Sequence, residues 1–372
     1  MAVPLKQLLY WLDERYPRSW AEAWDHVGLQ IGDPHRPVQR VGITLEAVSR
    51  SVTWARENRL DLLICHHPLF FRPVHSLDER SEPGRTASLL IREEIALVAL
   101  HTNLDVAPEG VSTALAKRLG LSRPVPLSPR KGDLVKVIVF VPLGYEERIL
   151  RALDEGQAGR IGNYRYCSFK TRGEGTFMGD PGSNPFIGEV GLLERAAEWR
   201  WETICPRHEA LDLIERLRKV HPYEEMAYDL YPLENPSADT GLGRWGRFDP
   251  PLDGRTLIRL LKERIEAPQI RVAGEVPDVV ETAAVCGGSA ASLIPQARAA
   301  GAQIFIGGEF GYHPLIAREA QPLTLIEIGH YPSEKWVIPV LAEALRNAAQ
   351  EGRWGIEVLE DLPSGDPHLT YL

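Results

Sequence analysis

Short apolar runs alternate with amphipathic stretches over the first third of the chain. Residues 5–14 carry apolar side chains at helical spacing with charges between them, which predicts an amphipathic first helix. Apolar runs at 41–45, 60–65 and 95–100 then alternate with helical stretches. This alternation predicts a mainly parallel sheet with helices on both faces.

The pattern of apolar and polar residues changes near Lys131. From there it predicts the order β-α-β-β-α-β, with strands over 134–141, 164–169, 199–204 and 226–231 and helices over 145–153 and 208–220. This order is typical of the ferredoxin-like unit. The Gly-rich and Pro-rich segment 172–191 is then expected to be a long loop between the two central strands, and loops of that length are often functional.

The alternation of apolar runs with helical stretches returns after a linker-like segment at 232–237. Further elements are predicted as a helix over 257–265, a strand over 283–286, a helix over 289–299 and a strand over 304–306. A chain of 372 residues is long enough for two cores. We therefore predict an α/β domain made of residues 1–127 and 237–372, interrupted by an inserted ferredoxin-like α+β domain of residues 128–236.

Composition narrows the possible partners and the compartment. The net charge of -9 is spread along the chain, so nucleic acid is not favoured as a partner, because phosphate backbones are bound by clustered Lys and Arg. The four cysteines lie far apart without a CxxC pair, which argues against a disulfide framework and a thiolate zinc site. The N-terminus lacks an export pattern and no run is long enough to span a bilayer, so we expect a cytoplasmic protein.

Candidate chemistry lies where three apolar runs end. His66 and His67 end the run that starts at Leu60, His101 follows the run at 95–100, and the run at 323–328 leads to His330. Two carboxylates, Asp105 and Glu334, each lie four residues after one of these histidines. If the three strands lie side by side in a parallel sheet, their carboxyl ends meet at one edge and the side chains converge. A mixed set of imidazoles and carboxylates indicates a site for Zn, Mn, Fe, Co or Ni.

The number of donors favours two divalent cations over one. A single ion that also holds a reactive water rarely takes more than three protein ligands. Asp105 and Glu334 are candidates to bridge a pair of ions. Glu334 also fits a simpler role, as a first-turn acid of a helix that Ser333 caps.

Three further residues are candidates for catalysis: His101, Glu309 and His313. His101 fits a metal ligand, a residue that orients a ligand, or an acid/base group, and its position allows all three. Glu309 and His313 follow the strand at 304–306 and point to the same sheet edge, where they would contact substrate or transfer a proton. The alternative for them is a Gly-rich turn with a capping acid. The segment Cys286–Ser289 fits an anion-binding turn, although an ordinary strand-to-helix turn is favoured.

Several separated segments resemble one known family. Cys65–Phe71, His101–Asp105, Gly308–His313 and Gly329–Glu334 resemble the signature segments of the NIF-three-like dinuclear metal proteins, which are also named GTP cyclohydrolase 1 type 2 homologs. The segment at 24–29 resembles their N-terminal segment. The segments at 162–164, 167–169 and 221–225 resemble the inserted domain of the longer members.

The resemblance implies a fold, an assembly and a ligand set. The fold is an α/β core with an insertion similar to small trimeric regulatory proteins, and the assembly is a toroidal homohexamer whose metal pairs face an internal cavity. The implied metal ligands are His66, His67, Asp105, His330 and Glu334, with Asp105 or Glu334 bridging the two cations. The chain departs from the family pattern outside this set, with Glu46 and Glu309 where Asp is usual and Ser112 where Asn is usual.

Two functions are compatible with such a site. The first is a metal-dependent hydrolase that activates a water, with His101 or His313 moving the proton and a nucleotide or phosphoester as the substrate. The second is a non-enzymatic, ring-forming scaffold or a regulatory, metal-sensing binding protein. An open metal position would favour the hydrolase, and a closed ligand shell would favour the binding protein.

Overall fold

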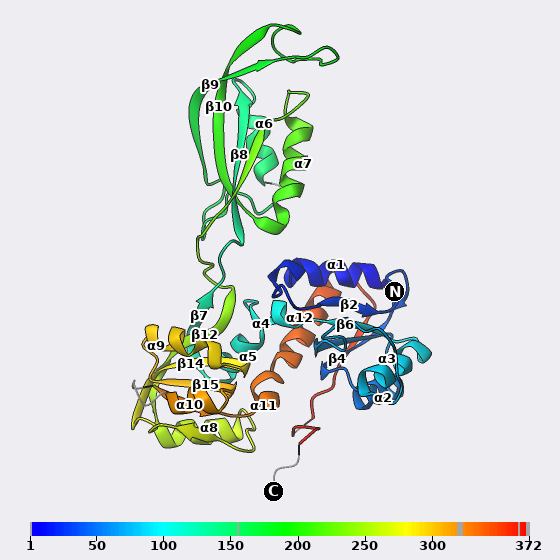
Figure 1. Cartoon of the computed structure of the whole chain (residues 1–372), viewed down its shortest axis with the longest axis vertical. Coiled ribbons are helices and arrows are strands. Elements are labelled where there is room, and N and C mark those ends of the chain that lie inside the picture. The colour runs from blue at the N-terminus through cyan, green and yellow to red at the C-terminus, as the bar shows by residue number, and fades with distance from the viewer. Residues whose placement is uncertain (1, 155, 318–322, 364, 370–372) are drawn as a thin grey trace. The chain divides into compact units, whose positions relative to one another are not determined.

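The structure is a computed structural model that describes residues 2–154, 156–317, 323–363 and 365–369. The chain divides into two compact units, which we call the split unit and the central unit. The split unit comprises Met1–Pro129 and Ala238–Leu372, and the central unit comprises Arg130–Ser237. Figure 1 shows both, and each is described by itself.

The first sheet of the split unit has five strands in the order β17-β4-β5-β6-β2. They are β17 (Glu357–Glu360), β4 (Arg40–Glu46), β5 (Leu62–His67), β6 (Ala96–Ala99) and β2 (Gly28–Ile31). The first four are parallel, and β2 is antiparallel to β6. Apolar side chains alternate along β5, so that Leu62 and Ile64 face one core cluster while Leu63 and Cys65 face another. Because both faces are apolar, helices cover both.

The helices on the two faces of this sheet come from different parts of the chain. One face packs against α1 (Leu5–Arg15) and α12 (Val337–Glu351). The other face packs against α2 (Ser49–Glu57) and α3 (Glu82–Arg92). This arrangement buries the parallel strands and leaves their carboxyl ends free to carry polar side chains.

A second sheet of the split unit has six strands in the order β13-β16-β15-β14-β12-β7. They are β13 (Arg271–Ala273), β16 (Thr324–Glu327), β15 (Ile304–Glu309), β14 (Val279–Ser289), β12 (Gly241–Asp253) and β7 (Leu121–Pro129). Only β14, β15 and β16 are parallel to one another. Its two faces pack on α5 (Val111–Leu119) with α8 (Gly254–Glu263), and on α9 (Ile294–Ala299).

The presence of two sheets corrects one expectation. The strands that end at His66–His67 and before His101 are neighbours in the first sheet, but the strand that leads to His330 is β16 of the second sheet. The condition that all three strands lie side by side in one parallel sheet is therefore not met, although their ends still meet. The reason is that residues after the central unit pair with β14 and its neighbours, and only β17 joins the first sheet. The fold is a mixed α/β fold with several sheets.

The central unit has the element order β8-α6-β9-β10-α7-β11. Its bounds are β8 (Leu134–Pro142), α6 (Glu146–Asp154), β9 (Ser168–Met178), β10 (Leu193–Pro206), α7 (Ala210–Val220) and β11 (Tyr228–Pro232). The strands pair antiparallel in the order β11-β8-β10-β9. Apolar residues of α6 and α7 pack with those of β8 and β10 in one core.

The predicted loop over 172–191 is wrong in its first part. Residues up to Met178 continue β9, so the connection to β10 covers only 179–192. Gly173 and Gly175 suggested a loop, yet Gly175 pairs with Ala196 in the sheet and lies under the carboxylate of Glu198. A glycine inside a strand often marks such a close approach.

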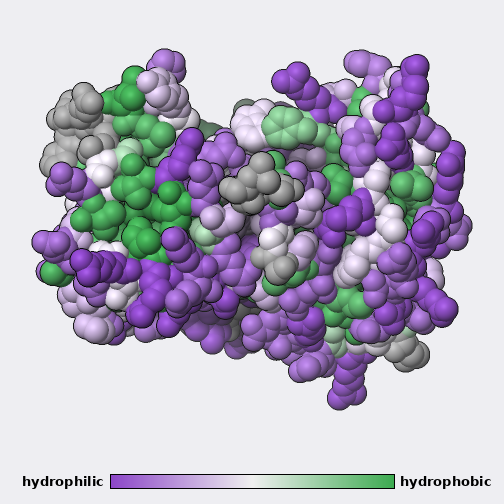
Figure 2. All heavy atoms as spheres, turned by 90° about the horizontal axis from the view of Figure 1, so that it is seen from below, coloured by the Kyte–Doolittle hydropathy of each residue, from purple (hydrophilic) through white to green (hydrophobic). Residues whose placement is uncertain are grey.

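No helix in the described ranges is both long and apolar enough to cross a membrane. Figure 2 shows one face of the molecule, where hydrophilic residues cover most of the surface and apolar residues gather toward the left of the view.

Candidate metal centre

The carboxyl ends of the two sheets of the split unit bring the candidate residues together. His66 and His67 are the last residues of β5. His101 precedes α4 (Thr102–Asp105), which follows β6 and carries Asp105. From the second sheet, α11 (His330–Glu334) follows β16 and places His330 and Glu334 one turn apart. Helix α11 packs on β14, β15 and α5, which fixes its position against the second sheet.

Glu334 lies at the centre of the cluster. Its Oε2 is 3.1 Å from Nε2 of His67 and 3.3 Å from Nε2 of His330. Its Oε1 is 4.0 Å from Nε2 of His66, and that nitrogen is 3.7 Å from Oδ1 of Asp105. Ligand atoms about 2.0–2.2 Å from one ion are about 3–3.5 Å apart, so these spacings suit metal ligation with small adjustments.

The donors form two overlapping groups. The first contains His66, His67 and His101, and the second contains His67, His330 and Glu334, with the donor atoms of each group within 4.8 Å of one another. The structure thus brings all five expected ligands, together with His101, to one place. The two groups share His67.

In three histidines of the cluster, the ring nitrogen Nδ1 lies within hydrogen-bond distance of an oxygen atom. Nδ1 of His66 lies 2.8 Å from the carbonyl oxygen of Leu100, Nδ1 of His101 lies 3.0 Å from Oδ1 of Asp25, and Nδ1 of His330 lies 2.8 Å from Oε1 of Glu309. A carbonyl or carboxylate oxygen accepts a hydrogen bond, so each Nδ1 donates. Such contacts orient metal-binding imidazoles and leave Nε2 free for the metal.

Two buried polar atoms of the cluster have no hydrogen-bond partner among the described residues: Nε2 of His66 and Oε2 of Glu334. Burial and the nearby charge of His67 lower the pKa of His66 to about 3, so its Nε2 carries a lone pair. Buried polar atoms without partners are costly, and a bound cation would satisfy both. The donor set therefore fits a divalent metal ion.

The electrostatics of the cluster also favour bound positive charge. Burial would raise the pKa of Glu334, but the charge of His67 and the close approach of Nε2 of His330 hold it well below its usual value. The nearby carboxylate of Glu334 raises the pKa of His330 to about 9, and for His67 the charge of Glu334 outweighs burial and raises the pKa to about 10. Burial and the Glu334 charge raise the pKa of Asp105 to about 7. Glu334 is therefore ionised without a metal, and a bound cation would favour the ionised form of Asp105 as well.

The carboxylate of Asp25 is a site residue that the sequence analysis missed. Its side chain is fully buried, and it accepts hydrogen bonds from the backbone nitrogen and hydroxyl of Thr102 at 3.0 and 2.5 Å. Burial opposes ionisation, but the hydrogen bonds from His101 and Thr102 outweigh it and lower the pKa of Asp25 to about 2. The signal for Asp25 was its place in the segment 24–29, which resembles the N-terminal segment of the family, but no pattern in the sequence linked it to His101.

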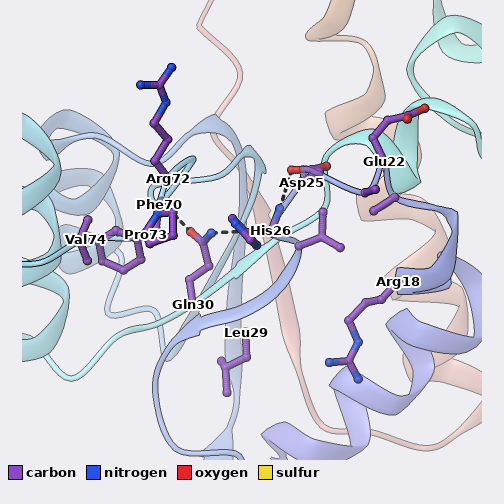
Figure 3. A pocket seen from close by; sticks show the side chains of 13 residues that line it. Arg18, Glu22, Asp25, His26, Leu29, Gln30, Phe70, Arg72, Pro73 and Val74 are labelled. Carbon is purple, nitrogen blue, oxygen red and sulfur yellow. Dashed lines mark hydrogen bonds between the residues drawn. The ribbon is translucent and has the colours of Figure 1, made fainter.

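A pocket of about 630 Å³ adjoins this Asp25–His101 pair (Figure 3). Its lining includes Asp25, Phe70, Arg18 and Arg72, and Figure 3 shows the two arginines at opposite ends of the labelled residues. Gln30 orders the wall by accepting from the backbone nitrogen of Phe70 and donating to the carbonyl of His26. The volume is in the range of small-molecule sites.

Two other candidate residues differ in their relation to the cluster. Glu309, at the end of β15, is an exposed residue that contacts the cluster through His330. His313 lies on α10 (Tyr312–Ala317), and its ring contacts Tyr312 at 5.8 Å; no contact with the cluster is found among the described residues. Glu46, at the end of β4, was missed as a contact of His67, whose Nδ1 lies 3.7 Å from its Oε1.

The segment Cys286–Ser289 is the end of β14, so the predicted turn into a helix is wrong. The helical residues that follow begin only at Ala291. Gly288 has a φ of +61°, and a Cβ on it would lie 2.4 Å from Oε1 of Glu334. Glycine here makes room for the Glu334 carboxylate instead of forming an anion-binding turn.

Comparisons with known proteins agree with this architecture. The family Duf34/NIF3 (NGG1p interacting factor 3) matches residues 3–362. A Bacillus subtilis protein named GTP cyclohydrolase 1 type 2 homolog is 35% identical over 370 residues, covering 99% of this chain and 98% of the relative. A Mycobacterium tuberculosis protein of the same name is 36% identical over 352 residues, covering 93% and 92%.

Solved structures give the same result. A Bacillus cereus protein related to NIF3 superimposes with a TM-score of 0.87 at 32% identity, with 100% of both chains covered. A Staphylococcus aureus protein superimposes with a TM-score of 0.80 at 27% identity, covering 100% of this chain and 99% of the other. The chain therefore belongs to the Duf34/NIF3 family.

Proposed function

We propose that this protein is a hydrolase that depends on a pair of divalent cations. The observation that supports it most is the orientation of three imidazole rings, those of His66, His101 and His330. Each ring contacts a partner through Nδ1 and leaves Nε2 for the cluster around the buried carboxylate of Glu334. His66 and Asp105 would hold one ion and His67 and His330 the other, with Glu334 or Asp105 bridging. The donor set suits Zn, Fe, Mn, Co or Ni.

The chemistry follows from the cations and from His101. When bound, the two cations would lower the pKa of a water and polarise an oxygen of the substrate. Ionised Asp25 keeps the proton of His101 on Nδ1, so Nε2 faces the cluster ready to accept a proton. His101 would thus act as the acid/base group, at the border between the cluster and the pocket. His313, which contacts Tyr312, is a weaker candidate for this role.

The pocket favours a phosphorylated, aromatic substrate such as a nucleotide. Arg18 and Arg72 supply positive charge, and Phe70 supplies an apolar wall. Arg18 pairs with Asp13 at 2.6 Å, and a phosphate would compete for that exposed guanidinium. The relatives named GTP cyclohydrolase 1 type 2 homolog make GTP the first compound to test.

The test combines metal content with activity. Hydrolysis of GTP, other nucleotides and phosphoesters is measured for metal-loaded wild type and for Asp105→Ala, with the exposed Asp33→Ala as the matched control. We expect Asp105→Ala to lose bound metal and activity together and Asp33→Ala to keep both. Retention of two metals by Asp105→Ala would refute the ligand assignment. Loss of metal with unchanged activity would refute the catalytic role.

The alternative function makes a different prediction in the same assay. A scaffold or metal-sensing protein would bind two cations per chain and hydrolyse none of the compounds. A response of its assembly state to metal would then support the regulatory role.

We also propose the domain arrangement and assembly that the resemblance implies. The strand order β11-β8-β10-β9 and the chain order of the central unit support a ferredoxin-like domain inserted into the α/β domain. Exposed apolar side chains, among them Val272, Tyr312 and Ile316, are compatible with contacts between copies in a homohexamer. Sedimentation of the intact protein tests this, because a hexamer has six times the 41.6 kDa chain mass.

A further inference from the structure

A second cavity lies entirely within the central unit. It has a volume of about 390 Å³, and its wall comes from β8, β9, the connection 179–192, β10 and the segment after α7. Its lining contains neither Lys nor Arg but four aromatic residues and three carboxylates: Phe140, Phe177, Phe186, Tyr223, Glu198, Glu224 and Glu225. An aromatic and acidic lining of this kind is suited to a cation.

Three of these rings lie at the wall of the cavity, where Tyr223 contacts both Phe177 and Phe186. The ring centre of Tyr223 is 6.1 Å from that of Phe177 and 6.1 Å from that of Phe186. Tyr145 supports the outer side of Phe186 at 5.6 Å. A cation within about 6 Å of an aromatic face is attracted by the ring quadrupole, and several rings together form a cage for organic ammonium groups.

Glu198 supplies a buried negative charge in this wall. Its relative exposure is 7%, and its carboxylate lies over Gly175, where a Cβ would come within 2.1 Å of Oε2. No ion pair to this carboxylate is found among the described residues. The hydroxyl of Tyr223 lies beside it, and burial and then the interaction with Glu198 raise the pKa of that hydroxyl. A buried carboxylate without a cationic partner is costly, so a cation in the cavity would be stabilised.

The wall of the cavity is held together by polar contacts. Nε2 of His221 lies 2.9 Å from the carbonyl oxygen of Phe140, and its Nδ1 accepts from the backbone nitrogen of Tyr223 at 3.2 Å. The Glu224 carboxylate accepts from the backbone nitrogen of Asn184 at 2.8 Å, which ties the connection 179–192 to the segment after α7. Tyr223 and Phe186 are therefore held in place before any ligand arrives.

We propose that this cavity binds a small organic ammonium ion, with Phe177, Phe186 and Tyr223 around its charged head and Glu198 as its counter-ion. The aromatic walls favour an organic cation over a metal ion, because hard metal ions require several oxygen ligands. The site is separate in sequence and in fold from the metal centre, and it does not depend on the hydrolase function.

The test uses choline and its neutral isostere 3,3-dimethylbutan-1-ol, which has the same shape without the charge. Binding to the full-length, metal-loaded protein is measured by calorimetry. We expect saturable binding of choline and at least ~10-fold weaker binding of the isostere. Equal binding of the two, or absence of choline binding up to about 10 mM, would overturn the proposal. Displacement of choline by lower concentrations of Ca²⁺ would also overturn it and indicate a metal site.

Substitutions locate the binding. Glu198→Gln should weaken choline binding by about 10-fold or more while leaving the metal content unchanged. Phe186→Leu should also weaken choline binding. Because Phe186 is half-exposed, this variant should fold even if Glu198→Gln does not. Phe169→Leu is the matched control, since Phe169 is an exposed ring of the same unit outside the cavity lining. Unchanged choline affinity in both Glu198→Gln and Phe186→Leu would refute the site.

Discussion

The carboxylate of Asp25 holds the ring of His101 at Nδ1, 3.0 Å away, although the two residues are 76 positions apart. The same carboxylate accepts two hydrogen bonds from Thr102 and is ionised because these contacts lower its pKa to about 2. The pair resembles the arrangement in which a buried acid sets the tautomer of an acid/base histidine.

Replacing Asp25 should therefore impair catalysis more than metal binding. In Asp25→Asn the negative charge that stabilises protonated His101 is lost, and an amide cannot accept from His101 at one atom and from Thr102 at the other. We expect turnover to fall by about 10²–10⁴-fold with two metals still bound. Turnover and metal content are measured together, with the exposed Asp33→Asn as the control. Wild-type turnover in Asp25→Asn would exclude the acid/base role of the pair.

Glycine at position 288 should be required for the metal centre. A Cβ there would come within 2.4 Å of Oε1 of Glu334, and the φ of +61° disfavours other residues. We expect Gly288→Ala to displace the carboxylate and lower metal occupancy. Gly301→Ala is the matched control, because Gly301 has a φ of +71° and open space around it; it should lose only about 1 kcal/mol of stability. Full metal occupancy in Gly288→Ala would show that Glu334 is not a ligand.

The sequence predicted the candidate site better than the arrangement of sheets. Polar residues at the ends of apolar runs located His66, His101 and His330, because strand ends are visible as local patterns. The sheet that each strand joins depends on pairing between distant segments, so β16 was placed in the wrong sheet. Asp25 and Glu46 were missed as site residues because single acids in loops or at strand ends have no distinguishing pattern.

Contacts between distant segments also explain why the glycines of β9 and β14 were wrongly predicted to lie in a loop and a turn. Gly173 and Gly175 in β9, and Gly287 and Gly288 in β14, have the local composition of turns. In the structure Gly175 accommodates Glu198 and Gly288 accommodates Glu334, which are contacts between segments far apart in the sequence. Only the folded chain reveals such a close approach.

A buried arginine should be a major determinant of the stability of the split unit. Arg244 of β12 is 1% exposed and donates to the carbonyl oxygens of Ala107, Gly241 and Gly243 at 2.6–2.8 Å. Arg244→Met would remove these three buried hydrogen bonds, and we expect a loss of about 3–5 kcal/mol in the free energy of unfolding. Arg247→Met, on the same strand with an exposed ion pair to Glu281, should cost at most about 1 kcal/mol. Equal denaturation midpoints for the two variants would contradict this role.

Metal affinity should rise with pH because protons and cations compete for the same atoms. Without metal, Glu334 helps to raise the pKa of His67 to about 10 and that of His330 to about 9, so both rings are protonated at pH 7. A cation requires the lone pair on each Nε2, and binding must therefore displace these protons. Above pH 9 to 10 the rings are neutral and the competition ends.

If two protons are released, the apparent affinity should increase by up to ~100-fold for each pH unit between about 6 and 8. Competition with a chelator at pH 6, 7 and 8 measures the affinity, after the pH dependence of the chelator is determined alone. Calorimetry in buffers of different ionisation enthalpy counts the protons independently. The variant His330→Ala should release one proton fewer, because only His67 then competes for its metal. An affinity that does not change between pH 6 and 8 would mean that these histidines do not bind the cations, and the ligand set would have to be sought elsewhere in the cluster.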